Sequence, residues 1–223
     1  MVLPGTPMPQ GPVCSNIIQA YHACWGDVQQ HHCRNPCAQP QSLERAHFPR
    51  LRSEEFVVAD KTDGVRYTFF LTTIQERPYA VLIDRKLTVY QIAVAASRKA
   101  FVGSIFDGEL VWQKTRETHT QVFLIFDVIA YRGCSKIKQA DYHARLEIIR
   151  NAFGLDGHLV ASPDDAQALA RKGKIICGGN AAGLSFQAKT CFPMNQLDTL
   201  LRRLSGLPYA TDGLIFTAVH QPV

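Results

Sequence analysis

A lysine and an arginine flank an aspartate and a glycine in the segment KTDGVR, residues 61–66. The segment lies between the apolar runs 56–59 and 67–70, so we interpret it as a turn between two strands. A lysine amine, with a reference pKa of about 10.4, becomes a nucleophile only after losing its proton, which a nearby positive charge such as Arg66 or a bound metal ion promotes. Gly64 would let the backbone approach a ligand closely, and Arg66 offers a forked donor to phosphate or ribose oxygens. The alternative is a β-turn with a surface salt bridge.

Three further segments place acidic residues at the mouths of apolar strands. They are 106–111 with Asp107 and Glu109, 123–129 with Asp127 directly after Phe126, and 211–217 with Asp212. Because an unpaired buried carboxylate is costly, Asp127 has to meet a donor or face a cleft. Each segment also has a structural interpretation: a hairpin corner, a strand-end aspartate paired with an arginine, and a helix-to-strand connection.

The elements that must position these residues follow from periodicity and turn residues. Short β-branched and aromatic runs predict strands over 67–73, 79–84, 87–90, 104–112, 122–131, 184–188 and 213–219. Helices are predicted from an N-cap at Asp141 to Gly154, over 164–173, and over 195–204, where leucines share one face. The strands from Val57 onward are expected to be mainly antiparallel.

The length of 223 residues accommodates one compact domain, expected over 17–223 after a flexible arm at 1–16. The arm is predicted because its prolines and glycines cannot supply regular backbone hydrogen bonds. A hydrophobic content of 46% with 19% charged residues excludes wholesale disorder. The net charge of +5 suits a protein that handles polyphosphates or RNA, although it is too small to establish this.

Membrane association and secretion are not expected. No apolar run approaches the roughly 20 residues that span a bilayer, and the first residues lack the charged and apolar regions of a signal peptide. The seven cysteines are odd in number and irregularly spaced, which is typical of free thiols. We therefore expect a reducing, intracellular compartment.

In their order along the chain, the lysine segment and the three acidic segments resemble the signature of covalent nucleotidyltransferases. This superfamily contains mRNA capping enzymes and ATP-dependent polynucleotide ligases. Thr62 after the lysine, and the run 212–216 beginning with aspartate rather than glutamate, favour the capping branch. Segments 38–43 and 82–85 are also similar to capping-enzyme segments, so the resemblance covers residue 38 to the end.

The resemblance implies an α+β, antiparallel-sheet nucleotidyltransferase fold of the ATP-grasp-like kind shared by DNA ligases and mRNA capping enzymes, with GTP in a cleft between sheets. It implies an mRNA guanylyltransferase in which Lys61 attacks the α-phosphorus of GTP, expels pyrophosphate and passes GMP to the 5′-diphosphate end of RNA. The other implied roles are ribose contacts for Arg66 and Glu109, stacking on guanine for Phe126, the guanine edge for Lys189, Mg²⁺ (or Mn²⁺) placement for Asp212, and support from Thr62, Asp63 and Asp127. For Lys189 the alternative is a solvated lysine at a strand end.

Guanylyltransferases continue into a lysine-rich motif and an OB-fold domain that closes over the nucleotide, whereas this chain ends at Val223. We therefore expect a nucleotidyltransferase domain truncated before these parts, with weak or partial activity unless another polypeptide supplies the OB-fold. Further polypeptides would supply the triphosphatase or methyltransferase steps. The expected location is the nucleus for a cellular protein, and the cytoplasm or virus particle for a large DNA virus.

Other interpretations remain open. The chain could be an ATP-dependent ligase core, or a non-catalytic fragment that binds nucleotide or a capping partner. Near the amino terminus, six side chains could ligate zinc, although their spacing does not match paired zinc ligands; they are His22, Cys24, His31, His32, Cys33 and Cys37. His32-Cys33 also resembles the cysteine phosphatases of some capping enzymes, but Gln39 occupies the position of the required arginine.

Overall fold

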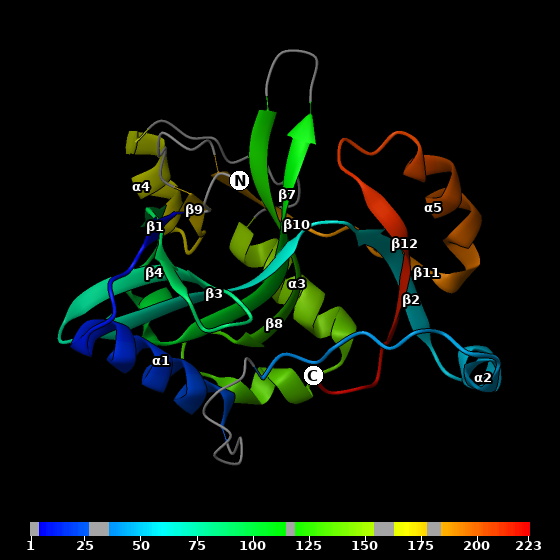
Figure 1. Ribbon diagram of the computed structural model, residues 1–223, viewed down its shortest axis with the longest axis horizontal. Coiled ribbons are helices and arrows are strands. Elements are labelled where there is room, and N and C mark those ends of the chain that lie inside the picture. Colours follow the sequence, from blue (N-terminus) through cyan, green and yellow to red (C-terminus); the bar gives the residue numbers. More distant parts are fainter. Residues whose placement is uncertain (1–4, 27–35, 115–118, 154–162, 178–183) are drawn as a thin grey trace.

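The structure is a computed structural model that describes residues 5–26, 36–114, 119–153, 163–177 and 184–223. Its centre is a seven-stranded sheet that is antiparallel except between its last two strands, β8 and β10, which are parallel. In spatial order the strands are β1 (Thr6–Pro7), β5 (Val89–Gln91), β4 (Arg77–Ile83), β3 (Val65–Ile74), β7 (Ser104–Lys114), β8 (His119–Ala130) and β10 (Leu184–Ala188). Figure 1 shows β7 and β8 extending together beyond the rest of the sheet.

A smaller sheet stands beside the large one and carries the predicted lysine. Its order is β11 (Phe192–Pro193), β2 (Phe56–Thr62) and β12 (Thr211–Ala218), all antiparallel. Helix α5 (Leu197–Leu204) covers one of its faces, where Leu200 packs with Val58 and Phe192. Two short strands, β6 (Val94–Ala95) and β9 (Ile176–Cys177), form a separate pair.

Two helices enclose the large sheet between them (Figure 1). Helix α1 (Pro12–Trp25) packs through Ile17 and Tyr21 on the face that carries Phe70. Because side chains of a strand alternate between faces, Phe69 points the opposite way, toward α3 (Tyr142–Phe153). The remaining helices are α2 (Phe48–Ser53), α4 (Pro163–Arg171) and the 3₁₀ turns Arg45–His47, Arg98–Val102, Ser135–Gln139 and Met194–Gln196.

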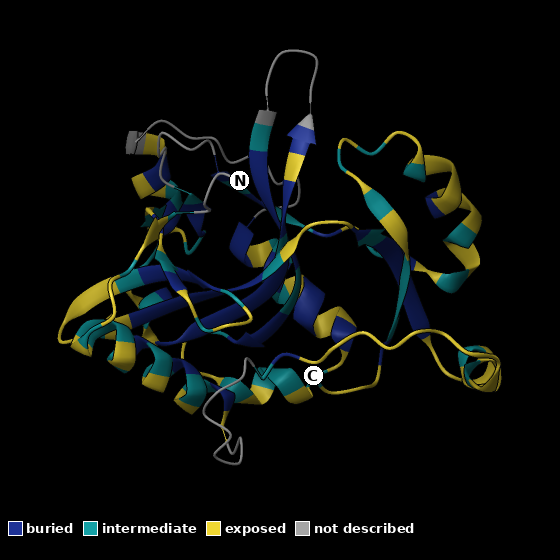
Figure 2. Ribbon diagram, viewed as in Figure 1, coloured by how far each residue is buried: buried dark blue, intermediate teal, exposed yellow. Residues whose placement is uncertain are grey.

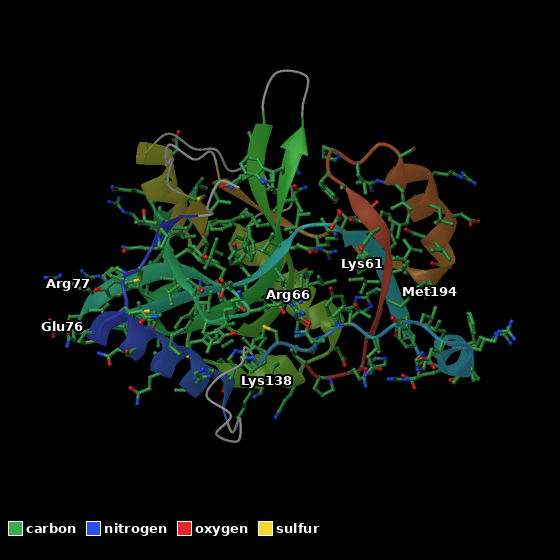
Figure 3. The ribbon with its side chains drawn as sticks, viewed as in Figure 1. Lys61, Arg66, Glu76, Arg77, Lys138 and Met194 are labelled. Carbon is green, nitrogen blue, oxygen red and sulfur yellow. The ribbon has the colours of Figure 1, made fainter. Side chains whose placement is uncertain are left out.

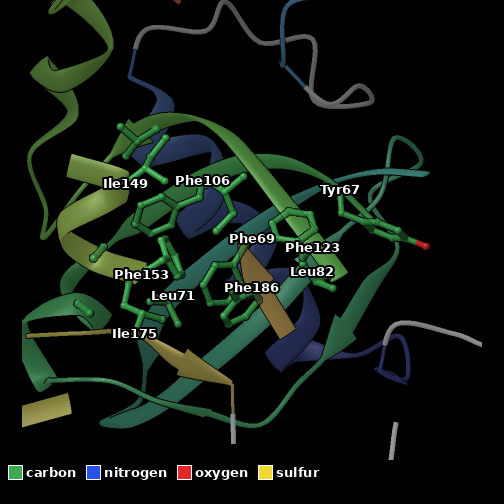
Figure 4. Packing of buried hydrophobic residues seen from close by; sticks show 14 of the residues in the cluster. Tyr67, Phe69, Leu71, Leu82, Phe106, Phe123, Ile149, Phe153, Ile175 and Phe186 are labelled. Carbon is green, nitrogen blue, oxygen red and sulfur yellow. The ribbon is translucent and has the colours of Figure 1, made fainter. Parts of the chain in front are cut away.

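The core under α3 is built from aromatic rings on neighbouring strands. Phe69 lies 4.8 Å from Phe186 and 6.1 Å from Phe106, measured between ring centroids, and Phe153 of α3 lies 4.9 Å from Phe106 (Figure 4). All four side chains are at most 5% exposed. In Figure 2 the central strands are accordingly buried, while α2 and much of α5 face solvent. This rigid centre fixes the strands that carry the candidate site.

The β3–β4 hairpin turns through two residues, Gln75 and Glu76, which both have positive φ angles of 49° and 65°. Two left-handed residues give a turn whose twist matches that of the flanking strands. Figure 3 labels Glu76 at this tip, and Lys138, which donates to the carbonyl oxygen of Trp25 at the end of α1. The tip is therefore at the opposite end of β3 from the lysine segment.

The α+β class and the mainly antiparallel sheet predicted from the sequence are confirmed. In its described part, residues 5–16, the predicted flexible arm is wrong: Thr6 and Pro7 pair with β5, and α1 begins at Pro12 rather than near Ile17. The sequence carries the signal for this helix, because proline is favoured in a first helical turn. The predicted helix end at Gly154 lies outside the described residues.

Two further expectations need correction. Lys61 is not in a turn but in β2, paired with Gly213 of β12, and the turn to β3 is made by Asp63 and Gly64. Likewise Asp107, Glu109 and Asp127 lie inside long strands rather than at strand mouths. Within the described ranges, no helix is long and apolar enough to cross a membrane.

Candidate active site

Lys61 and Asp212 face each other across the β2–β12 pair because the ladder contains a bulge. Thr211 pairs with Thr62 and Gly213 pairs with Lys61, so Asp212 is the extra residue between them. The Lys61 ammonium donates to Asp212, with Nζ and Oδ2 2.5 Å apart. Both side chains are partly open to solvent, at 38% and 49% exposed. Figure 3 labels Lys61 and Arg66 in the middle of the molecule, where the small sheet meets the large one.

The pKa of Lys61 is raised by its hydrogen bond to Asp212 and by the negative charges of Asp212, Glu109 and Asp63, against a smaller opposing effect of burial. Asp63 is exposed in the turn. In this state Lys61 is therefore an ammonium donor. It must leave Asp212 and lose a proton before its nitrogen can attack an electrophile.

Arg66 is held by Asp107 of the neighbouring strand β7. Its Nε and Nη2 donate to Asp107 Oδ1 and Oδ2 at 3.0 and 2.5 Å, and Nη1 donates to the carbonyl oxygen of Ala38 at 2.7 Å. The guanidinium carbon lies 5.5 Å from the centre of the Phe126 ring. The structure thus places Arg66 beside Phe126. It also shows that Asp107 holds Arg66, a contact for which the sequence gave no indication.

Glu109 lies directly opposite Arg66 in the β3–β7 ladder and interacts with three positively charged side chains. Burial raises its pKa, whereas a hydrogen bond from the Gly64 backbone and the charges of Lys189, Lys61 and Arg66 lower it in part. Gly64 N and Glu109 Oε1 are 3.3 Å apart. A Cβ at position 64 would meet the Leu110 carbonyl oxygen at 2.6 Å, so the glycine permits close contact with β7.

Lys189 is not the solvated strand-end lysine of the alternative interpretation, because it is only 7% exposed. Its ammonium donates to Asp60 Oδ2 at 2.7 Å and to the hydroxyl of Thr62, and lies 5.5 Å from the centre of the Tyr209 ring. An ammonium has three donor hydrogens, so one remains for a ligand. Asp60 was missed from the sequence, where only its position directly before Lys61 could have drawn notice.

Asp127 supports the site from behind. Its Oδ1 and Oδ2 accept from Arg145 Nε and Nη2 at 2.8 and 3.3 Å, so the interpretation as an aspartate paired with a nearby arginine holds. Tyr142, on the same helix α3, donates to the Phe126 carbonyl oxygen at 2.7 Å. These contacts fix the backbone of Phe126 from two sides.

The zinc interpretation gains no support from the described residues, which contain no group of three or more His, Cys, Asp or Glu side chains placed to hold a metal ion. Cys37 is buried, with its Sγ 3.3 Å from the Thr68 hydroxyl. His31, His32 and Cys33 lie outside the described residues.

A lysine paired with a carboxylate, a nearby glutamate, an aromatic ring beside a clamped arginine and a second, buried lysine lie together, as the resemblance to nucleotidyltransferases implies. Residues 16–223 match the family model described as mRNA capping enzyme, catalytic domain, so the chain belongs to this family.

Individual relatives agree with the family. The chain is 36% identical over 202 residues to the mRNA-capping enzyme subunit alpha of Neurospora crassa, covering 84% of this chain and 47% of the relative. It is 29% identical over 110 residues to the protein of the same name from Schizosaccharomyces pombe, covering 44% and 27%. The chain therefore spans less than half the length of these curated relatives. A solved chain described as "Pmar-Lig_Pre." overlaps with a TM-score of 0.45 at 12% identity, covering 82% of this chain and 42% of its own length, which is too distant to support an argument.

Proposed function

We propose that this chain carries out the guanylyl transfer of mRNA capping through Lys61. The Lys61 nitrogen forms a bond to the α-phosphorus of GTP, the bond to pyrophosphate breaks, and the amine proton passes to solvent. The resulting lysyl–GMP then passes GMP to the terminal phosphate oxygen of a 5′-diphosphate RNA, which restores the amine. The observation that carries the proposal is the contact between Lys61 and Asp212 beside Glu109.

Asp212 would be one ligand of a hard divalent cation, because Mg²⁺ and Mn²⁺ prefer oxygen ligands, and the phosphates of GTP would supply others. Asp212 is half exposed, and Glu109 and Asp63 lie close enough for their charges to act on Lys61. A cation held by Asp212 would supply positive charge that neutralises the phosphates. The protein would contribute by separating Lys61 from Asp212. Loss of that hydrogen bond lowers the pKa of the Lys61 amine toward a reactive value.

The proposed nucleotide contacts use the ring face and the hydrogen-bonding groups that the site residues do not use on one another. Phe126 has Arg66 over one face of its ring, and the other face would stack on guanine. Lys189 retains one donor for the guanine edge. Glu109 would accept from the ribose hydroxyls. Arg66 would reach the ribose only by yielding one of its present contacts with Asp107 or Ala38.

The acceptor is proposed to be a 5′-diphosphate RNA, and polypeptides that supply an OB-fold, a triphosphatase or a methyltransferase are proposed as partners. The proposed location is intracellular, and nuclear in a cell that caps RNA there. The support is the family match over residues 16–223 and the names of the curated relatives, which are called capping-enzyme subunits.

The proposal is tested by incubating the chain with α-³²P-labelled GTP and Mg²⁺ and then denaturing it. Label should remain on the wild-type chain and be lost in Lys61→Ala, while Lys86→Ala, a matched change of an exposed lysine, should keep it. Labelled ATP in place of GTP separates the ligase alternative. Label that survives Lys61→Ala, or GTP binding without an adduct even when the remaining capping-enzyme region is added, would refute covalent transfer by this residue.

A further inference from the structure

The buried hydroxyl of Tyr142 lies between the two segments that are proposed to contact guanine. It donates to the carbonyl oxygen of Phe126 at 2.7 Å, and its oxygen lies 3.5 Å from the sulfur of Cys191. Cys191 follows Lys189 by two residues, and the positive charge of Lys189 acts on its thiol. One side chain of α3 therefore contacts both the strand with the proposed stacking ring and the segment with the proposed guanine-edge lysine.

The direction of these hydrogen bonds follows from the hydrogens available. A tyrosine hydroxyl has one hydrogen and two lone pairs, so Tyr142 gives its hydrogen to Phe126 and accepts from the Cys191 thiol. Burial raises the pKa of the Tyr142 hydroxyl well above its ordinary value, and burial also raises the pKa of Cys191. Both groups are therefore neutral at physiological pH, and they form a chain of hydrogen bonds that ends on the backbone of Phe126.

The two segments are also neighbours in the large sheet. In the parallel pair of β8 and β10, Ala188 lies opposite Ile125, and the Lys189 amide donates to the Ile125 carbonyl oxygen at 2.7 Å. After Lys189 the chain leaves this sheet and enters β11 of the small sheet. Beyond the end of the ladder, the tyrosine hydroxyl between Phe126 and Cys191 links the two segments.

Tyr142 is itself held in place at the start of α3. Its backbone N–H donates to the carbonyl oxygen of Val219 at 2.8 Å, and the Arg145 guanidinium carbon lies 5.2 Å from the centre of its ring. The residue is only 3% exposed, so its hydroxyl has little access to water as an alternative partner. A hydroxyl fixed in this way holds its two partners at a constant separation.

We propose that Tyr142 and Cys191 are positioning residues through which the site selects guanine over adenine, an inference that rests on the proposed function. Guanine presents an acceptor oxygen where adenine presents an amino group, so an ammonium can donate to guanine there but not to adenine. Phe126 stacks on either purine, because every base has an aromatic face. Discrimination therefore depends on where the Lys189 ammonium lies relative to the stacked base. The hydrogen bonds of the Tyr142 hydroxyl hold the Phe126 and Cys191 segments in that relation.

The test is Tyr142→Phe, which removes the hydroxyl and keeps the ring. The ratio of kcat/KM for adduct formation with GTP to that with ATP should fall about tenfold, through a higher KM for GTP and little change in kcat. The matched control Tyr131→Phe removes a hydroxyl from another tyrosine that packs on the same core, and it should leave the ratio unchanged. Cys191→Ala should also lower the ratio, whereas Cys191→Ser, which keeps a donor for Tyr142, should retain more of it.

An unchanged ratio in Tyr142→Phe would overturn the proposal, and so would equal losses with GTP and ATP, because a purely structural role affects both nucleotides alike. Equal effects of Cys191→Ala and Cys191→Ser would exclude a role for the thiol hydrogen bond. If the wild type forms no adduct, the proposed function fails, but equilibrium dialysis of GTP and ATP still tests the positioning role. Tyr142→Phe should then bind GTP more weakly and ATP as before. Equal changes for the two nucleotides, or no GTP binding by the wild type, would overturn the proposal.

Discussion

Asp107 holds two nitrogens of Arg66, at 3.0 and 2.5 Å, while the same guanidinium lies 5.5 Å from the ring centre of Phe126. Asp107 is only 3% exposed and sits on β7, whereas Phe126 sits on β8. Asp107 on β7 therefore sets where the Arg66 guanidinium lies relative to the Phe126 ring on β8. This makes Asp107 a positioning residue for both proposed nucleotide contacts.

Asp107→Asn should destabilise the chain by about 3–5 kcal/mol, because removing one partner of a buried ion pair leaves the other charge uncompensated. The Arg66 side chain is 13% exposed, so water can replace little of the lost interaction. Urea unfolding measures the change. The comparison is Glu54→Gln, which breaks the exposed Arg50–Glu54 pair and should leave the stability almost unchanged. Equal costs for the two variants would show that the Arg66 pair is no stronger than a surface contact.

Asp212→Asn should lower the pKa of Lys61, because the hydrogen bond to Asp212 is the main cause that raises it. The positive charge of Lys61 would lose its nearest carboxylate, so the amine would release its proton at lower pH. NMR titration of isotopically labelled lysine, with Lys61→Arg to assign the signal, reads the midpoint directly. A Lys61 midpoint that stays in place, or one that moves together with that of exposed Lys86, would mean that the two side chains do not pair in solution.

The sequence picks out the candidate catalytic residues through ordered motifs, but it does not indicate most of the side chains that contact them. Lys61 and Asp212 were recognised as members of ordered motifs, and the structure brings them into contact. Asp60 pairs with Lys189, 129 residues away, because of the face on which each strand places its side chains. Single-sequence periodicity gives the face of a residue within one strand but not which strand lies opposite. For the same reason, the sequence did not predict the bulge at Asp212, which places its side chain next to Lys61.

Gly64→Ala should destabilise the chain by about 1–3 kcal/mol, the usual cost of forcing added atoms into a packed region. A Cβ there would meet a backbone oxygen at 2.6 Å and the Glu109 side chain at 2.8 Å. The backbone oxygen cannot move without shifting β7, so Glu109 would also be displaced and GTP use should fall. Gly206→Ala is the matched change, since its nearest neighbour would be at 3.6 Å. Thermal or urea unfolding compares the two, and equal stability would contradict the tight approach of the Asp63–Gly64 turn to β7.

His220 should make the stability of the chain depend on pH. Its pKa is raised by a hydrogen bond and charge from Asp141 and by the charge of Glu55, with distances of 3.1 Å from Nδ1 to Asp141 Oδ1 and 3.3 Å from Nε2 to Glu55 Oε2. These contacts join the segment after β12 to the start of β2 and the start of α3. A group whose folded pKa lies above its unfolded value stabilises the fold fully below the unfolded pKa, and the contribution is lost as pH rises through the folded pKa.

His220→Gln should therefore be less stable than the wild type at pH 5.5 and nearly equal to it at pH 8.5, as measured by urea unfolding at both pH values. Because the pair is exposed, the difference should shrink further at 1 M salt, where charges are screened over about 3 Å. Asp141→Asn should remove most of the same pH dependence, since the proton on His220 would lose its main partner. A wild-type advantage that is the same at both pH values would show that His220 acts through packing, and one that grows with pH would reverse the sign of the linkage.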